Sequence, residues 1–265
     1  MIVCAITGHT GVLGSNFIKN NPDIKFIKFS KDLSKKNDIK KWINENSFNY
    51  FLHFGAIVPT LEVNKNYKYA KKVNYYSTIN IINELKKKNK KIWFFYSSSS
   101  HVYGYSDKKL NEQSKTRPAN QYGKLKLLSE IIIKKKLKDS KVKFCIGRIF
   151  SFTHYKQDKS FFIPSVFTHM AKITNTFRDF IDVRDICNVI RILINKKKEG
   201  IFNIASGKKI NLTKISEIIL KKKTPYKSKP KNNIYADISK IKKLGWKSRY
   251  DINDIIKDYK KNYKK

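Results

Sequence analysis

The chain opens with the segment IVCAITGHTGVLG (residues 2–14), in which an apolar run leads directly into three glycines spaced three residues apart. This pattern is typical of a strand that turns sharply into a helix whose N-terminus binds a dinucleotide. Gly8 permits the tight turn, Gly11 lets the backbone approach a pyrophosphate, and Gly14 lets the helix pack against the strand. The alternative is a glycine-rich turn without a ligand. We predict a cofactor site at Gly8, His9, Thr10, Gly11, Val12, Leu13 and Gly14.

Short apolar runs alternate with longer amphipathic ones over the first 150 residues. The predicted strands are residues 2–6, 25–29, 50–54, 92–96 and 142–149, and the predicted helices are 11–20, 38–46, 67–89 and 120–137. This alternation predicts an α/β fold, a doubly wound parallel sheet of the Rossmann type with helices on both faces. Right-handed crossovers then place all strand carboxyl ends on one edge, where ligands bind.

The alternation loosens beyond about residue 150. Helices are predicted over 162–172, 184–195, 212–222 and 251–263, short strands over 179–183 and 201–204, and a loop over 221–233. We therefore predict an NAD(P)-binding Rossmann domain over residues 1–150. A smaller C-terminal substrate lobe is expected over 151–265, with some segments returning to the first domain.

The formal net charge of +38 raises the question of a nucleic-acid partner. Only six of the 58 basic residues are Arg, on which recognition of phosphates and base edges leans heavily. The lysines are scattered, or stand in short runs at the ends of predicted helices. We predict solvated lysine-rich faces and no specific nucleic-acid partner, and a positive field that favours an anionic substrate.

Cys4, Cys145 and Cys187 fall in apolar segments and show no metal-ligand spacing. We predict buried free thiols in a reducing cytosol, and no metal site. No run of about 18 apolar residues is present, so we predict no membrane span. A signal peptide would remove the first predicted strand, and the expected location is therefore cytoplasmic.

The pattern Tyr-x-x-x-Lys recurs by chance in so lysine-rich a chain, and only its context can separate the occurrences. The pair Tyr122 and Lys126 follows the serine run at 97–100 and starts an apolar-periodic helix. Residues four apart share a helix face, so Lys126 can lie beneath the Tyr122 hydroxyl. A cation there would stabilise the phenolate and lower the tyrosine pKa, as a general acid or base requires.

Taken in order, these motifs resemble those of the extended short-chain dehydrogenase/reductases that act on nucleotide sugars, the NAD-dependent epimerase/dehydratase family. The resemblance covers most of the chain. It includes the glycine motif, His53-Phe54-Gly55-Ala56, Val73-Asn74, Ser99, Tyr103-Gly104, Tyr122, Lys126, the segment Arg178-Asp179-Phe180-Ile181-Asp182-Val183, Phe202-Asn203-Ile204-Ala205, Ala236-Asp237 and Leu244-Gly245-Trp246.

The resemblance implies a role for each catalytic residue. Tyr122 exchanges a proton with the sugar oxygen, and Lys126 tunes Tyr122 and holds the nicotinamide ribose. Ser99 hydrogen-bonds the reacting oxygen, with Ser98 as the alternative in the serine run. Asn74 is expected to be structural rather than catalytic.

Further contacts are implied on either side of these residues. Arg178 would meet the nucleotide diphosphate, the alternative being an ion pair with Asp179 or Asp182. The segment starting at Phe162-Ile163-Pro164 would close over the base. The remaining predicted contacts are Ser30, Lys31, Asp32, Leu33, Phe54, Gly55 and Ala56 for the cofactor, and Ser100 and Ser151 for the substrate.

Departures from the family pattern refine these expectations. The second strand ends without the carboxylate that NAD-selective members use, and Ser30 and Lys31 would suit a 2′-phosphate, so NADP is favoured over NAD. Asp32 and Leu33 would then line the adenine side. Ser100-His101 replaces the Asp-Glu pair of dehydratases, which argues against dehydration.

Two further departures concern the sugar. Ser151 stands where many epimerases carry Asn, and the short stretch between Lys126 and Arg178 predicts a trimmed sugar pocket. We expect hydride transfer at carbon 4 of a nucleotide sugar, with a lean towards a 4-keto-sugar reductase over a 4-epimerase. A non-catalytic nicotinamide- or polyanion-binding protein is the alternative of another class. Family members commonly dimerise, and a homodimer stays open here.

Overall fold

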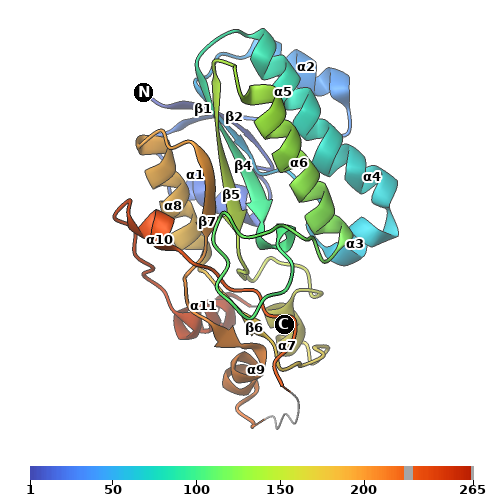
Figure 1. Cartoon of the computed structure of the whole chain (residues 1–265), viewed down its shortest axis with the longest axis vertical. Helices are drawn as coiled ribbons and strands as arrows, with labels where there is room; N and C mark the ends of the chain where they lie inside the picture. Colours follow the sequence, from blue (N-terminus) through green and yellow to red (C-terminus); the bar gives the residue numbers. More distant parts are fainter. Residues whose placement is uncertain (224–228, 264–265) are drawn as a thin grey trace.

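A six-stranded parallel sheet forms the centre of the computed structural model, which describes residues 1–223 and 229–263 (Figure 1). The strands are β1 (Val3–Thr7), β2 (Lys25–Lys28), β3 (Tyr50–His53), β4 (Ile92–Ser99), β5 (Val142–Ile149) and β7 (Gly200–Ile204), in the order β2-β1-β3-β4-β5-β7. The predicted doubly wound α/β fold is confirmed. Strand β4 continues three residues beyond its predicted end, so that most of the serine run belongs to the strand.

Helices cover both faces of the sheet, as Figure 1 shows. One face carries α1 (Val12–Lys19) and α8 (Val183–Asn195), and the other carries α2 (Lys36–Glu45), α5 (Ser77–Lys87) and α6 (Gln121–Leu137). Successive side chains of a strand point to opposite faces, so Phe95 belongs to the first apolar cluster and Phe94 to the second. Burial on both faces explains why these strands are apolar almost throughout.

The carboxyl ends of β1, β3 and β4 meet at one edge of the sheet, where the strands end at Thr7, His53 and Ser99. The chain passes from β1 outward to β2 and then returns to β3 on the other side of β1. Ligands of open parallel sheets bind at such a reversal of strand order. The fold therefore brings the glycine turn and the serine run to one place.

The helix predicted over 67–89 is divided. It consists of α4 (Tyr67–Lys71), a π-helical turn (Lys72–Tyr76) and α5, and the short α3 (Thr60–Lys65), which we did not predict, precedes it. In the π turn the Asn74 amide accepts from Ile57 N and donates to Ile57 O, both at 2.8 Å. Asn74 thus holds the loop after β3 in place, which is the structural role we expected.

The chain beyond β5 builds a smaller layer below the carboxyl edge of the sheet (Figure 1). Its elements are α7 (Phe162–Phe167), β6 (Phe177–Arg178), β8 (Ile210–Asn211), α9 (Leu212–Leu220) and α11 (Ile252–Asn262). Helix α10 (Ser239–Lys242) instead packs against β7, and its Ile241 belongs to the apolar cluster of α1 and α8. Helices α7, α9 and α11 share an apolar cluster that includes Ile163, Ile215 and Ile255. Strand β7 instead pairs with β5 in the main sheet. The domain boundary at residue 150 stays a prediction.

The strand predicted over 179–183 was wrong. Asp179 accepts hydrogen bonds from the backbone N–H and hydroxyl of Ser206, and Asp182 is the N-cap of α8, accepting from Arg184 N at 2.8 Å. These carboxylates fix an irregular segment between β6 and α8, because the backbone groups that they bind would otherwise require partners.

The helix predicted over 162–172 was too long. Helix α7 ends at Phe167, and His169 adopts a left-handed φ of 57° that closes the last turn. Helix α9 ends at Leu220, one residue before Lys221, which is also left-handed. Part of the loop predicted over 221–233 lies outside the described residues.

Cys4, Cys145 and Cys187 are unpaired and buried, as predicted. Within residues 1–223 and 229–263, no helix combines the length and apolar character needed to cross a membrane.

Candidate active site

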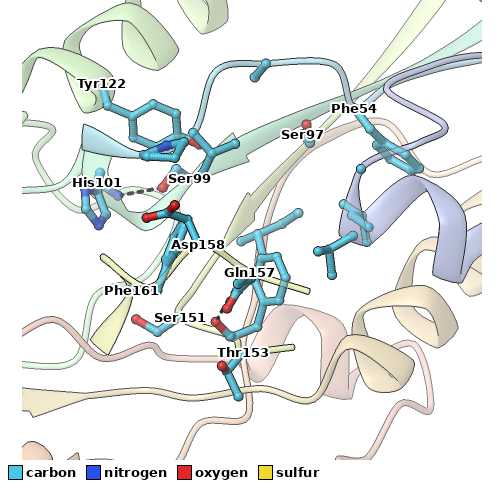
Figure 2. A pocket seen from close by; sticks show the side chains of 18 of the residues that line it. Phe54, Ser97, Ser99, His101, Tyr122, Ser151, Thr153, Gln157, Asp158 and Phe161 are labelled. Atoms are coloured by element: carbon cyan, nitrogen blue, oxygen red, sulfur yellow. Dashed lines mark hydrogen bonds between the residues drawn. The ribbon is translucent and has the colours of Figure 1, made fainter. Parts of the chain in front are cut away.

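A cavity of about 620 Å³ lies at the carboxyl edge of the sheet. Its wall is formed by the glycine turn, the ends of β3, β4 and β5, the start of α6 and the loop that follows β5. Figure 2 shows Ser99, His101 and Tyr122 together at one end and Phe54 near helix α1 at the other. The lining includes these predicted residues: Gly8, Thr10, Gly11, Val12, Leu13, Gly14, Phe54, Gly55, Ala56, Ser99, Ser100, Tyr122, Lys126 and Ser151.

The three glycines of the turn leave backbone, rather than side chains, at their positions on the cavity wall. Gly8 has a φ of +69°, and a Cβ there would lie 2.5 Å from Gly55 N. A Cβ on Gly14 would lie 2.2 Å from Gly8 O, so α1 could not pack so close to the turn. Gly11 caps α1 without a side-chain hydrogen bond, which leaves the first N–H groups of the helix available to an anion.

The serine run presents its hydroxyls to different partners. Ser97 Oγ donates to His53 O at 3.0 Å, and Ser98 Oγ donates to the buried Glu130 carboxylate. Ser99 Oγ accepts from His101 N at 3.2 Å and also hydrogen-bonds Tyr122. The Ser99 hydroxyl is thus the one of the run that lies beside the phenol. The geometry favours Ser99 over Ser98 as the hydroxyl that meets a ligand.

Two features of α6 bring Tyr122 to Ser99. The helix begins after Asn120, whose side chain accepts from Gly123 N at 2.8 Å and satisfies one of the free N–H groups of the first turn. A Cβ on Gly123 would lie 2.1 Å from His101 O, so only glycine allows α6 to approach the 3₁₀ turn that follows β4. The Asn-x-x-Gly sequence thus sets both the start and the depth of the helix.

Lys126 lies one turn beyond Tyr122 and is 2% exposed. Its Nζ donates to Ser97 O at 2.7 Å and lies 5.8 Å from the centroid of the Tyr122 ring. Burial lowers the pKa of Lys126 to about 7, against the opposing effect of the Glu130 carboxylate. Desolvation favours the uncharged amine over the ammonium in such a site.

Burial raises the pKa of Tyr122, and the hydrogen bond with Ser99 opposes that rise. We expected a lowered tyrosine pKa, and for the protein by itself this expectation was wrong. The reason is that the phenol is almost completely removed from water, and the desolvation cost of a phenolate exceeds what nearby polar groups return. Tyr122 therefore rests as a neutral phenol that can give up a proton.

A buried ion pair supports the end of β4. Arg148 on β5 donates to Glu130 on α6 with Nη2 to Oε2 at 2.7 Å, and the two side chains are 3% and 0% exposed. The same carboxylate binds Ser98, and Arg148 Nη1 donates to the Tyr103 hydroxyl at 2.9 Å. Sequence reasoning missed this network. The available signal was Glu130, a carboxylate two turns beyond Tyr122 on the same buried helix face.

The residues predicted to hold the adenosine end lie outside the cavity lining. Ser30 and Lys31 are exposed just beyond the end of β2. The Asp32 carboxylate accepts from Ser34 N and Oγ, both at 2.7 Å, and these bonds lower the pKa of Asp32. The Leu33 side chain packs against the position where Gly55 would carry a Cβ.

His9 also lies outside the lining, although its neighbours on both sides belong to it. Its Nδ1 is buried without a hydrogen-bond partner among the described residues. The side chain of His9 therefore forms no part of the cavity wall.

Arg178 lies outside the lining as well. Its guanidinium donates to the carbonyls of Phe177 and Asn232, at 3.0 and 2.5 Å, and burial lowers its pKa. The alternative of an ion pair with a neighbouring carboxylate was wrong: Asp179 accepts from Ser206, and Asp182 pairs with Arg184 at 2.7 Å.

Several lining residues were not predicted. They include His101, the segment Val58-Pro59-Thr60-Leu61 after β3 and, from the loop after β5, Thr153, Lys156, Gln157, Asp158 and Phe161. Phe162 and Ile163 follow in the lining at the start of α7, where we expected a segment that closes over the base. The loop gave no periodic or motif signal, because its position depends on packing against elements distant in sequence.

Comparison with known proteins identifies the family. A sequence model of the family described as GDP-mannose 4,6 dehydratase matches residues 15–226 of this chain. The ADP-L-glycero-D-manno-heptose-6-epimerase of Brachyspira hyodysenteriae is 27% identical over 310 residues, covering 96% of this chain and 95% of that protein.

Solved structures share the fold over nearly the whole chain. RMD from Pseudomonas aeruginosa complexed with NADPH has a TM-score of 0.87 at 17% identity and covers 99% of both chains. The UDP-glucose 4-epimerase of Thermus thermophilus complexed with NAD has a TM-score of 0.84 at 15% identity, covering 98% of this chain and 100% of that one. Since the family model matches most of the sequence, the chain belongs to the NAD-dependent epimerase/dehydratase family of extended short-chain dehydrogenase/reductases.

Proposed function

We propose that this chain transfers a hydride between a nicotinamide cofactor and carbon 4 of a nucleotide-linked sugar, as a reductase of a 4-keto-sugar. The observation that carries the proposal is that Ser99, Tyr122 and Lys126 lie on the wall of one cavity together with the glycine turn. Membership of the family supports a nucleotide sugar as the substrate. The net charge of +38 surrounds such an anionic substrate with a favourable field.

The residues at the glycine turn fit a dinucleotide. Gly8 and Gly14 keep the turn free of Cβ atoms, and the uncapped N-terminus of α1 suits a pyrophosphate. We assign the cofactor to residues 8–14 and 54–56, and its nicotinamide ribose to Lys126. NADP is favoured over NAD because Ser30 and Lys31 are exposed beyond β2, while the Asp32 carboxylate is bound to Ser34.

A reduced nicotinamide, when bound, supplies the hydride to the keto carbon. Tyr122 donates its phenolic proton to the oxygen that becomes a hydroxyl, and Ser99 donates a hydrogen bond to that oxygen as negative charge develops. Lys126 stabilises the tyrosinate that remains, as long as its amine is protonated. With a pKa of about 7, this protonation is present below neutrality and is lost above it.

The sugar side of the cavity is lined by Ser100 and Ser151, which we assign to the substrate. Arg178 would have to release two backbone carbonyls before its guanidinium could bind a diphosphate. Lys156 is an exposed cation that already lines the cavity. We therefore assign a substrate phosphate to Lys156 first and to Arg178 only after rearrangement.

A 4-epimerase is the second candidate function. The match to the heptose epimerase relative covers 96% of this chain, and the serine run followed by Tyr103-Gly104 resembles that of epimerases. In this reaction Tyr122, as tyrosinate, would accept the hydroxyl proton while the hydride passes from carbon 4 to a bound oxidised nicotinamide. The keto-sugar would then rotate in the site, and the hydride would return to the other face of the carbon and the proton to the oxygen. The cofactor is regenerated in every cycle and need never leave the protein.

Mass spectrometry of the small molecules released on denaturation separates the two functions. Protein that releases no cofactor, binds NADPH more tightly than NADH and oxidises it with a 4-keto-sugar nucleotide supports the reductase. Stoichiometric release of NAD⁺ supports the epimerase instead. Failure to bind either nicotinamide would exclude both enzymatic functions and favour a non-catalytic role.

A further inference from the structure

His101 occupies a distinctive place on the cavity wall. Its ring meets that of Tyr122 edge to face, with centroids 5.8 Å apart, and its backbone N–H donates to Ser99 Oγ (Figure 2). The proposed mechanism gives it no task. An imidazole can donate or accept at either nitrogen, so its chemistry in the cavity depends on which nitrogen carries the proton.

The amide of Asn120 decides this question. Its Oδ1 is committed to the N-terminus of α6, because it accepts from Gly123 N at 2.8 Å. The other end of the amide is then the NH₂ group, which lies 2.7 Å from His101 Nδ1. Since an amide nitrogen can only donate, Nδ1 must accept. A neutral imidazole that accepts at Nδ1 carries its proton on Nε2.

The second nitrogen is free to act on a ligand. Within the part of the chain that the structure describes, His101 Nε2 has no hydrogen-bond partner, and it is not among the fully enclosed orphan atoms. Burial lowers the pKa of His101, the hydrogen bond with Asn120 opposes that shift and the nearby Arg178 cation adds to it, and the net lowering favours the neutral ring. The neutral imidazole therefore has one N–H group, and Asn120, the N-cap of α6, determines that this group is at Nε2.

We propose that Asn120 fixes the tautomer of His101, and that His101 Nε2–H donates a hydrogen bond to an oxygen of the sugar next to the reacting carbon. This inference rests on the proposed function. It makes His101 a specificity-determining residue, which selects sugars that carry an oxygen next to the reacting carbon. Asn120 is a positioning residue, since it acts through His101. Ser99 and Tyr122 are already assigned to the reacting oxygen, so His101 is assigned to a neighbouring oxygen of the sugar.

Asn120→Asp tests the tautomer on the purified protein without substrate. Asp caps helices as well as Asn, but its second oxygen accepts and requires a proton on His101 Nδ1. The imidazole nitrogen chemical shifts, measured by NMR at about pH 9 where an ordinary imidazole is neutral, should show an N–H at Nε2 in the wild type and at Nδ1 in the variant. Wild-type protein with its proton on Nδ1 would overturn the inference. Matching thermal unfolding midpoints show that α6 remains capped.

A second set of variants tests the contact with the sugar. His101→Gln keeps an amide N–H near the position of Nε2, whereas His101→Asn reaches only as far as Nδ1. With 4-keto-sugar nucleotides and NADPH, we expect kcat/KM to fall about tenfold in His101→Asn, the effect of one hydrogen bond, and to be largely preserved in His101→Gln. Equal losses in the two variants would contradict the contact.

The combination of the variants separates positioning from a general structural effect. Asn120→Asp should lower kcat/KM in the wild-type background and have no further effect in the His101→Gln background, because that side chain has no tautomer to change. Additive losses would show that Asn120 acts independently of His101. If the wild type reduces none of the substrates, the proposed function and the sugar contact fail together, while the NMR result still decides the tautomer.

Discussion

At the scale of single residues, desolvation is the main cause of the shifted pKa values of Tyr122 and Lys126, two ionisable groups of the cavity wall. It raises the pKa of Tyr122 and lowers that of Lys126, which keeps both groups neutral above about pH 7. The Glu130 carboxylate, one further turn along α6, opposes that shift and favours the ammonium form of Lys126. The charge of Lys126 therefore depends on a residue that lies behind the cavity wall.

Replacing Tyr122 with Phe removes the proton donor and keeps the ring. We expect kcat to fall by about 10²–10⁴-fold, the usual contribution of a positioned general acid, with NADPH affinity nearly unchanged in a fluorescence titration. Tyr105→Phe is the matched control, since Tyr105 begins another Tyr-x-x-x-Lys pair but is 51% exposed. Full activity in the Tyr122 variant would show that the chemistry takes place elsewhere.

Replacing Lys126 with Met should abolish turnover and stabilise the fold. A buried ammonium is costly, so at pH 6 we expect a gain of about 1–3 kcal/mol in the free energy of unfolding. The folded pKa of about 7 lies below the unfolded value of 10.5, so wild-type stability rises with pH between these values. The advantage of Met should therefore shrink over that window. Denaturant titrations at several pH values measure it, and a less stable variant at pH 6 would contradict the argument.

At the scale of elements, the approach of α6 to the turn after β4 depends on a single missing side chain. The Cβ of alanine at position 123 would lie 2.1 Å from His101 O, so the helix or the turn must shift. We expect Gly123→Ala to destabilise the protein by about 1–3 kcal/mol and to lower kcat/KM at least tenfold by separating Tyr122 from Ser99.

Lys124→Ala is the control for this substitution. Lys124 is exposed on the first turn of the same helix, and its loss should leave both the unfolding free energy and kcat/KM close to those of the wild type. If Gly123→Ala behaves like the control, the close approach of α6 has no part in assembling the site.

At the scale of the whole molecule, the net charge of +38 acts on anything anionic that approaches. We expect the KM for the nucleotide sugar to rise as salt increases from about 0.05 to 0.5 M, because screening weakens the attraction, with kcat nearly constant. Steady-state kinetics over this range measures the effect. Polynucleotide binding should disappear by physiological salt, and its persistence would favour the polyanion-binding alternative.

The sequence by itself determined the strands of the first half of the chain, most of the helices between them and the family to which the chain belongs, but it missed α3. The hydrophobic periodicity of each segment and the glycine spacing at 8, 11 and 14 are local properties of the sequence. The parallel sheet follows from the alternation of short apolar segments with longer amphipathic ones. Beyond residue 150 the C-terminal end of α7 and the segment 179–183 depended on a left-handed turn and on capping carboxylates, and there the predictions failed.

Only the tertiary structure decided which of these residues share a cavity and in what chemical state. Ser98 and Ser99 are adjacent in sequence, but Ser98 is bound by Glu130, which lies 32 positions away. The exclusion of Arg178 from the cavity, the raised pKa of Tyr122 and the partner of His101 likewise depend on contacts between distant segments. The physical reason is that desolvation and hydrogen-bond partnership are properties of the packed chain, and no local pattern encodes them.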